Sequence, residues 1–104
     1  MAEILVLTTA DSSELAARIA TELVEAREAA CVNIVPGVRS IYRWEGKVCD
    51  EQELLLVIKS TRDRFEAVRA RIRQVHTYQV PEIVAVEVEA GDPDYLAWLR
   101  GQLG

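Results

Sequence analysis

Apolar residues open the chain in a continuous run at positions 3–9, EILVLTT. Such a run predicts a strand that is buried on both faces, in the middle of a sheet. The spacing of apolar residues then becomes helical, with leucine or isoleucine at 15, 19 and 23. Asp11 with Glu14 three positions later is typical of a helix start, so we expect a helix that Asp11 caps and that runs to about residue 28.

Two strand-like segments follow at 31–43 and 47–60, and Glu45-Gly46 between them predicts a tight hairpin turn. Pro36-Gly37 interrupts the first segment and is typical of a bulge or bend rather than an uninterrupted ladder. Beyond this break, alternate residues share one face of the strand: Val38, Ser40, Tyr42 and Trp44.

The remaining chain predicts three more elements. An apolar stripe among arginines predicts a helix that Ser60 or Thr61 caps and that ends near His76. Alternating valines at 84, 86 and 88 predict a fourth strand with one wet face. Asp92-Pro93 is typical of a capped helix start, and a last helix follows it.

The order of these elements places the chain in the α+β class. It predicts a ferredoxin-like βαββαβ fold with an extra C-terminal helix and a long central β-hairpin. The chain has 104 residues, half of them hydrophobic, which suits a single domain over 1–104 with one core.

The central hairpin is too long for the body of one such domain. A strand of about 14 residues is on the order of 45 Å long, whereas a compact domain of this size is about 34 Å across. The tip carries Ile41, Tyr42, Trp44 and Val48, and an isolated two-stranded ribbon is only marginally stable. We expect a second copy of the chain to cover it; the alternative is a bend at Pro36-Gly37 that folds the hairpin onto its own sheet.

The net charge limits the partners that we expect, and the apolar segments limit the compartment. The net charge is -5 and the isoelectric point is near 4.9, so nucleic acid and anionic membranes are not expected partners. The start of the chain lacks a basic segment before its apolar run, and no apolar stretch is long enough to cross a membrane. We therefore expect a cytoplasmic protein in which Cys31 and Cys49 remain free thiols.

Five separated blocks of the sequence resemble the CutA family of divalent-ion tolerance proteins. They span nearly the whole chain, in the order 30–34 (ACVNI), 40–47 (SIYRWEGK), 53–61, 76–83 (HTYQVPEI) and 94–99 (DYLAWL). The resemblance implies a ferredoxin-like subunit and a homotrimer in which long hairpin strands reach neighbouring sheets. It also implies tolerance of divalent metals, copper above all, and a likeness to PII-type signalling trimers that sense ligands.

The sequence departs from this family at three positions. Thr8 stands where some members have a cysteine, and Val75 precedes the only histidine where some have paired histidines, which have been proposed as copper ligands. Thr77 replaces the proline that usually follows this histidine. His76 is therefore the remaining candidate copper ligand of that set, and a neighbouring subunit would have to add donors.

The aromatic residues predict a cleft between subunits. We expect it to combine aromatic walls with polar groups, as small-ligand pockets do, and its residues are Tyr42, Trp44, Lys59, His76, Tyr78, Glu82 and Trp98. The alternative is that the aromatic side chains are plain anchors of an oligomer interface.

Four candidate groups have two interpretations each. His76 is a metal ligand or a residue that caps a helix and bonds to the backbone. Cys31 is a metal thiolate or a small buried hydrophobic residue. Glu82 is a ligand clamp or one half of an ion pair with Lys59 or Arg43. The acidic residues at 50, 51 and 53 are a weak hard-cation site or a solvated edge.

These observations predict a trimeric metal-homeostasis protein that binds copper or another divalent cation, with a PII-like sensing role. The alternative is a structural or signalling trimer that has protein partners and no metal chemistry. A hydrolase with His76 as general base and Glu82 as its orienting group lacks an identifiable nucleophile, so we expect no enzymatic activity.

Overall fold

Four antiparallel strands form one sheet in the computed structural model, which describes residues 2–104. Their order across the sheet is β2-β3-β1-β4, which is the order of a ferredoxin-like fold. The strands are β1 (Glu3–Ala10), β2 (Cys31–Trp44), β3 (Lys47–Thr61) and β4 (Val84–Glu87). The helices are α1 (Ser13–Glu25), α2 (Phe65–Val75) and α3 (Pro93–Gln102), with a short 3-10 turn at Arg62–Arg64.

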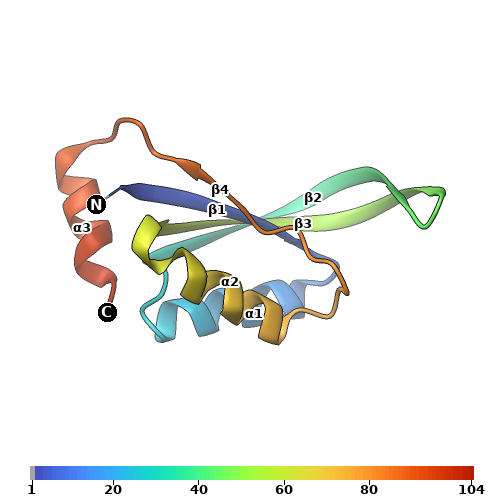
Figure 1. The fold of residues 1–104 in the computed structure, drawn as a ribbon, viewed down its shortest axis with the longest axis horizontal. Coiled ribbons are helices and arrows are strands. Elements are labelled where there is room, and N and C mark those ends of the chain that lie inside the picture. Colours follow the sequence, from blue (N-terminus) through green and yellow to red (C-terminus); the bar gives the residue numbers. More distant parts are fainter. Residues whose placement is uncertain (1) are drawn as a thin grey trace.

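Two helices cover one face of this sheet. Figure 1 shows α1 and α2 side by side beneath the strands, while α3 lies at the end of the molecule opposite the tip of the β2–β3 hairpin. The core fills the space between the sheet and these two helices; its most buried side chains include Val6, Ile19, Leu23, Leu56, Ile58 and Ile72. The predicted α+β architecture and the extra C-terminal helix are confirmed.

The central strand is buried on one face only. Ile4 and Val6 of β1 point into the core, but Leu5 and Leu7 lie on the opposite face and are half-buried. The prediction of burial on both faces is therefore wrong for a single copy, because no helix covers the second face. We call this second face the open face; it carries Leu5, Leu7, Leu55, Val57, Val84 and Val86.

The boundaries of α1 differ from the prediction at both ends. Ser12, not Asp11, is the N-cap, because its hydroxyl accepts a hydrogen bond from the backbone N–H of Leu15 at 3.1 Å. The helix ends at Glu25 because Arg27 adopts a left-handed conformation with φ of 59°. The backbone N–H of Glu28 then bonds to the Leu23 carbonyl in a Schellman arrangement, which usually has glycine at the left-handed position.

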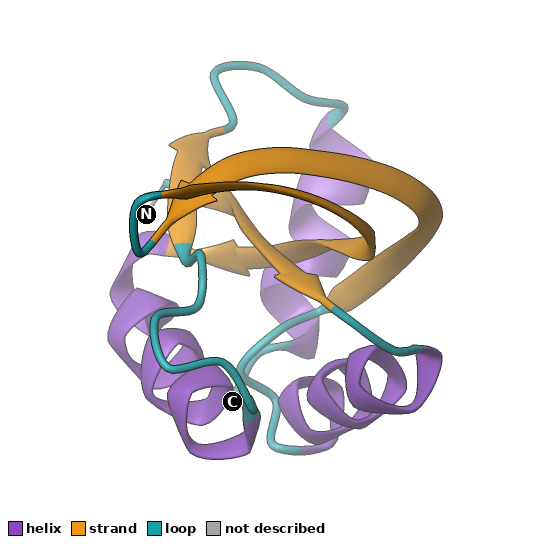
Figure 2. Ribbon diagram, turned by 90° about the vertical axis from the view of Figure 1, so that its right-hand side faces the viewer, coloured by secondary structure: helices purple, strands orange, loops and turns teal. Residues whose placement is uncertain are grey.

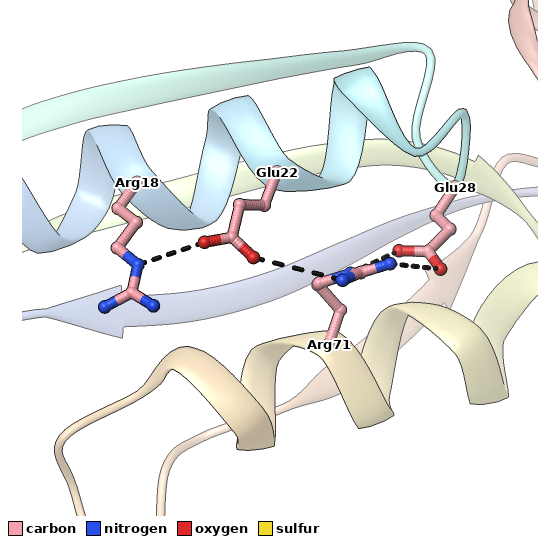
Figure 3. Close-up of polar contacts among 4 residues, drawn as sticks. All are labelled: Arg18, Glu22, Glu28 and Arg71. Atoms are coloured by element: carbon pink, nitrogen blue, oxygen red, sulfur yellow. Dashed lines mark hydrogen bonds and ion pairs between the residues drawn. The ribbon is translucent and has the colours of Figure 1, made fainter.

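An ion network joins α1 to α2 (Figure 3). Arg71 of α2 donates to both carboxylate oxygens of Glu28, at 3.0 and 3.3 Å, and lies 3.9 Å from Glu22 of α1. Arg18 pairs with the other oxygen of Glu22 at 3.0 Å. The hydrogen bond to Glu28 raises the pKa of Arg71, so this guanidinium holds the chain after α1 against α2.

The start of α2 also differs from the prediction. The Ser60 hydroxyl donates to the Glu28 carbonyl, and Thr61 donates to the Asp63 side chain, so neither caps the helix. The 3-10 turn intervenes and α2 begins at Phe65. The predicted end near His76 is confirmed, as is the cap of α3 by Asp92, whose carboxylate accepts from two backbone N–H groups.

The central hairpin projects well beyond the body of the molecule. The structure measures 44 Å along its longest axis against 25 and 22 Å along the others, and the hairpin tip lies at one end of the long axis (Figure 1). Figure 2 looks along the hairpin and shows how strongly its strands curl. The alternative, a fold-back of the hairpin at Pro36-Gly37, does not occur, and Ile41 and Val48 near the tip are 63% and 67% exposed.

The turn and the bulge of this hairpin are confirmed. Trp44 pairs with Lys47, and Glu45 and Gly46 both have positive φ, at 51° and 79°, as a type I′ turn requires. The pairing of β2 with β3 shifts between Val35 and Val38, and Gly37 has φ of 78°.

Both cysteines are free thiols, as predicted. Cys31 pairs with Lys59 and Cys49 with Tyr42, at distant points of the β2–β3 ladder. Within residues 2–104, no helix combines the length and the apolar character needed to span a membrane.

Candidate functional site

The bulge in β2 decides which side chains meet at the base of the hairpin. It inserts an extra residue, so the even-numbered residues of the outer half of β2 face the same way as the odd-numbered residues of β3. Tyr42 thus lies opposite Cys49, and Val38 lies opposite Glu53. As predicted, Val38, Ser40, Tyr42 and Trp44 share a face.

A cleft of about 480 Å³ lies at this place, between the hairpin and the segment that follows α2. We call it the hairpin-base cleft; the lining residues used below are Ile41, Tyr42, Glu53, Tyr78, Val80 and Glu82. A smaller hollow of about 250 Å³ adjoins it, shares Tyr78 and Val80, and is lined by Trp44. The cleft therefore combines aromatic, aliphatic and carboxylate side chains from β2, β3 and the segment 76–82.

His76 holds the segment after α2 in place. Its backbone N–H closes the helix by bonding to the Ile72 carbonyl, and its Nε2 donates to the Thr9 carbonyl at 2.7 Å. Its Nδ1 accepts from the backbone N–H of Tyr78 at 3.0 Å, which assigns the neutral ring with hydrogen on Nε2. Both ring nitrogens are thus used inside the chain, in agreement with the second interpretation given above, and a metal would have to displace one of these bonds.

Two tyrosines donate to two carboxylates beside the cleft. The Tyr78 hydroxyl donates to Glu53 at 2.5 Å, and the Tyr42 hydroxyl donates to Glu51. Burial and the bond to Glu53 raise the pKa of Tyr78, while the bond to Glu51 raises the pKa of Tyr42 to about 12. Both phenols are therefore protonated hydrogen-bond donors at neutral pH.

The predicted acidic patch is divided by these bonds. Asp50 is held by Arg39 through two bonds of 2.8 and 2.6 Å, whereas Glu51 and Glu53 accept from the tyrosines. Across residues 2–104, no three His, Cys, Asp or Glu side chains gather in a way that would hold a metal ion.

The structure gathers only part of the predicted site in one copy. Tyr42, Tyr78 and Glu82 line the cleft, Trp44 lines the adjoining hollow, and His76 supports the wall. The remaining members, Lys59, Cys31 and Trp98, do not reach these residues.

Lys59 and Cys31 lie together near the other end of the β2–β3 ladder. The Lys59 ammonium donates to Asn33 and is 3.7 Å from the Cys31 sulfur, which is half-buried rather than enclosed in the core. Trp98 is in α3, where its ring lies 5.7 Å from that of Tyr95. Because α3 and the hairpin tip are at opposite ends of the molecule, Trp98 is remote from the cleft (Figure 1).

The predicted ion pair of Glu82 is absent from the described residues. Lys59 has the partners just given, and Arg43 donates to the Gly46 carbonyl at 3.5 Å. Glu82 is instead exposed at the rim of the cleft. The sequence had singled out this carboxylate, whereas the buried one is Glu53, at 7% exposure. The position of Glu53 at the cleft follows from the shifted register, which sets Glu53 opposite Val38 and could not be predicted from the sequence.

A second hollow, of about 380 Å³, lies between β4 and the start of α2. The charged residues Arg62 and Glu87 in its wall pair with each other. None of the predicted site residues lines it, so the hairpin-base cleft is the candidate site.

Known proteins with similar sequences and structures share one description. A family model described as CutA1 divalent ion tolerance protein matches residues 4–102. The divalent-cation tolerance protein CutA of Thermus thermophilus is 52% identical over 102 residues, which cover 98% of this chain and 99% of that protein. The solved structure from that organism superposes with a TM-score of 0.95 over 98% of this chain and 99% of that chain.

More distant solved structures have the same fold. CutA1 from Oryza sativa is 38% identical and has a TM-score of 0.97, covering 100% of this chain and 95% of that chain. A structure from Archaeoglobus fulgidus, described as a periplasmic divalent cation tolerance protein CutA, is 36% identical with a TM-score of 0.93. It covers 96% of this chain and 97% of that chain. The long hairpin and the single sheet are therefore shared across distant organisms.

Proposed function

Because the chain belongs to the CutA family of divalent-ion tolerance proteins, we propose that it serves in tolerance to divalent cations as a homotrimer that binds its ligand at the hairpin-base cleft. The observation that carries this proposal is the 52% identity, over nearly the full length, to a divalent-cation tolerance protein. Copper is the first cation to test, and ligand binding in the manner of a PII-type sensor is the expected mode of action.

The trimer is supported by apolar surface that one copy leaves uncovered. The open face carries leucine and valine side chains from three strands, and Val84 and Val86 on its edge strand are about half exposed. Ile41 and Val48, which lie on the other face of the projecting hairpin, add further exposed apolar surface. Fully burying an exposed side chain of this size contributes about 1.5–3 kcal/mol, so covering the exposed part of these half-buried side chains favours association of the open faces.

A metal site in this proposal needs more than one copy. Copper takes thiolate or imidazole donors in a defined geometry, and the described part of one chain does not assemble them. His76 and Cys31 remain the proposed donors of that chemical type. His76 would have to release the Tyr78 N–H, and Cys31 would have to leave the Lys59 ammonium.

No catalytic step is part of the proposal. The general base considered from the sequence, His76, has both ring nitrogens bonded to backbone groups. A base without a free lone pair does not accept a proton from a substrate. The proposal keeps the cytoplasm as the compartment, since free thiols are typical of reducing surroundings.

The trimer and the metal are tested separately. Light scattering should give about three times the 11.6 kDa mass of one chain at micromolar concentration, and a monomer would contradict the proposed assembly. Calorimetry should then show saturable Cu²⁺ binding by the assembled protein. His76→Gln should weaken it if His76 is a donor, whereas Gln74→His, on the exposed side of α2, is a control for nonspecific imidazole binding.

The exposed hairpin tip favours one alternative, a signalling trimer with protein partners and no metal chemistry. Ile41 and Val48 are among the most exposed large apolar side chains of the protein. A partner that binds the purified trimer and is lost in Val48→Ser, together with an absence of Cu²⁺ binding, would support this alternative.

A further inference from the structure

Within the described residues 2–104, Glu53 is a buried carboxylate without a cation. It is 7% exposed, and the one side-chain hydrogen bond that reaches it from this part of the chain comes from the neutral Tyr78 hydroxyl. None of the ion pairs among residues 2–104 includes it. Removing a carboxylate from water costs several kcal/mol, on the order of what a paired cation returns. Its side chain lines the hairpin-base cleft, so a cation in the cleft would offset this cost.

The charges around the cleft add to this demand. Arg39 also lines the cleft, but its guanidinium donates two hydrogen bonds to the carboxylate of Asp50. Glu82 lines the cleft and Glu51 lies beside it, bonded to Tyr42. The carboxylates that act on Tyr42 and Tyr78 all raise the pKa of the phenols, which reflects a negative potential at this place.

The walls of the cleft suit an apolar stem. Tyr42 and Tyr78 provide aromatic side chains, Ile41 and Val80 provide aliphatic ones, and Trp44 lines the adjoining hollow. Aromatic rings beside carboxylates are the surroundings that bind ammonium and guanidinium groups. A volume of about 480 Å³ lies within the range of small-molecule sites.

The same walls are unsuitable for a bare metal ion. A divalent cation needs several convergent donors, and the described residues of one copy provide no such cluster. An organic cation needs only one carboxylate for its charge and gains from the apolar wall.

We propose that the hairpin-base cleft binds a small organic cation, in which an ammonium or guanidinium group lies against Glu53 and an apolar stem lies along Tyr42 and Tyr78. This proposal rests on the cleft being the ligand site of the proposed function, and it names the class of ligand.

The test compares three ligands that share a pentyl stem on the assembled protein. Calorimetry and amide chemical shifts are measured with n-pentylammonium, its neutral counterpart 1-pentanol and the anion hexanoate. We expect the ammonium to bind at least about tenfold more tightly than the alcohol, to shift the Tyr78 amide and to weaken with salt, and hexanoate not to bind.

Variants then locate the charge. Glu53→Gln retains an oxygen for the Tyr78 hydroxyl and should weaken ammonium binding about tenfold while leaving 1-pentanol unaffected. Glu82→Gln, at an exposed position where folding is not at risk, should weaken binding by a smaller factor. Glu89→Gln removes an exposed carboxylate outside the cleft and should change nothing.

Three outcomes would overturn the proposal: no ammonium binding at millimolar concentration, equal affinity for ammonium and alcohol, or an unchanged affinity in both Glu53→Gln and Glu82→Gln. A trimer that binds Cu²⁺ but no amine would overturn this inference and leave the proposed function intact. A different result would be that Glu53→Gln dissociates the trimer and that no amine binds the native protein. In that case a side chain of a second copy fills the cleft, and the proposal of an organic cation as ligand is refuted.

Discussion

Replacing glycine by alanine at two positions of this chain should change the free energy of unfolding in opposite directions. Gly37 lies in the β2 bulge with φ of 78°, and an added Cβ would meet no atom within 4 Å. Gly101 lies in the last turn of α3, where an added Cβ also meets no atom within 4 Å. Because neither site has a steric clash, the change to alanine isolates the backbone contribution to the free energy of unfolding.

The magnitudes follow from the two backbone conformations. A left-handed alanine costs about 1–2 kcal/mol, and the lower entropy of the unfolded chain offsets about 0.4–1 kcal/mol of that cost. Gly37→Ala should therefore lower the free energy of unfolding by about 1 kcal/mol. Gly101→Ala should raise it by about 0.5–1 kcal/mol, because alanine is the better helix former.

The assay is urea unfolding followed by circular dichroism at one fixed protein concentration, because assembly contributes to the stability of an oligomer. The two variants should differ by about 1.5–2 kcal/mol, with unchanged slopes of the unfolding free energy against urea. Equal stabilities of Gly37→Ala and Gly101→Ala would refute the left-handed bulge, and with it the register that places Tyr42 and Glu53 on one face.

Three further predictions test other parts of the structure. Arg71→Lys should cost about 1 kcal/mol in urea unfolding because lysine does not reproduce the two-bond contact with Glu28, whereas exposed Arg73→Lys should cost nothing measurable. The hydrogen bond from Arg100 lowers the pKa of Glu3. This ion pair therefore stabilises the folded state fully above pH 4.5, the ordinary pKa, and the stabilisation is lost as the pH falls through the lower pKa of the folded state. Glu3→Gln should make the free energy of unfolding depend less steeply on pH in this acidic range. Val86→Glu should convert the proposed trimer to smaller species in light scattering, and an intact trimer would show that the open face is not the interface.

Turns and helix ends could be predicted from the sequence where a residue has one strong backbone preference. Glu45-Gly46 and Asp92-Pro93 predicted a turn and a helix start that the structure confirms. The end of α1 was not readable, because Arg27 occupies a left-handed position that usually signals itself by glycine. The cap at Ser12 was displaced by one residue because Asp11 and Ser12 are both good caps.

The candidate site was less predictable because it depends on register. The sequence identified Tyr42, Tyr78 and Glu82, but it treated Glu53 as one member of an acidic patch that was either a weak hard-cation site or a solvated edge. Burial of Glu53 follows from the segment after α2, which His76 anchors to Thr9 so that Tyr78 reaches across β3. No spacing in the sequence encodes that crossing, since residues 53 and 78 belong to different elements.

The open face divides into two regions with different chemistry, and the bulge marks the boundary between them. On the inner side of the bulge its side chains are mainly leucine and valine, with Lys59 as a single cation. On the outer side the same face of the sheet carries Tyr42, Glu51 and Glu53, and Tyr78 of the segment after α2 donates to Glu53. Apolar side chains without polar partners favour association, whereas a carboxylate that lacks a cation favours a charged ligand. Because one sheet carries both regions, a ligand in the cleft that orders the hairpin base also orders part of the proposed interface. Ligand binding and association of the chains are therefore linked equilibria.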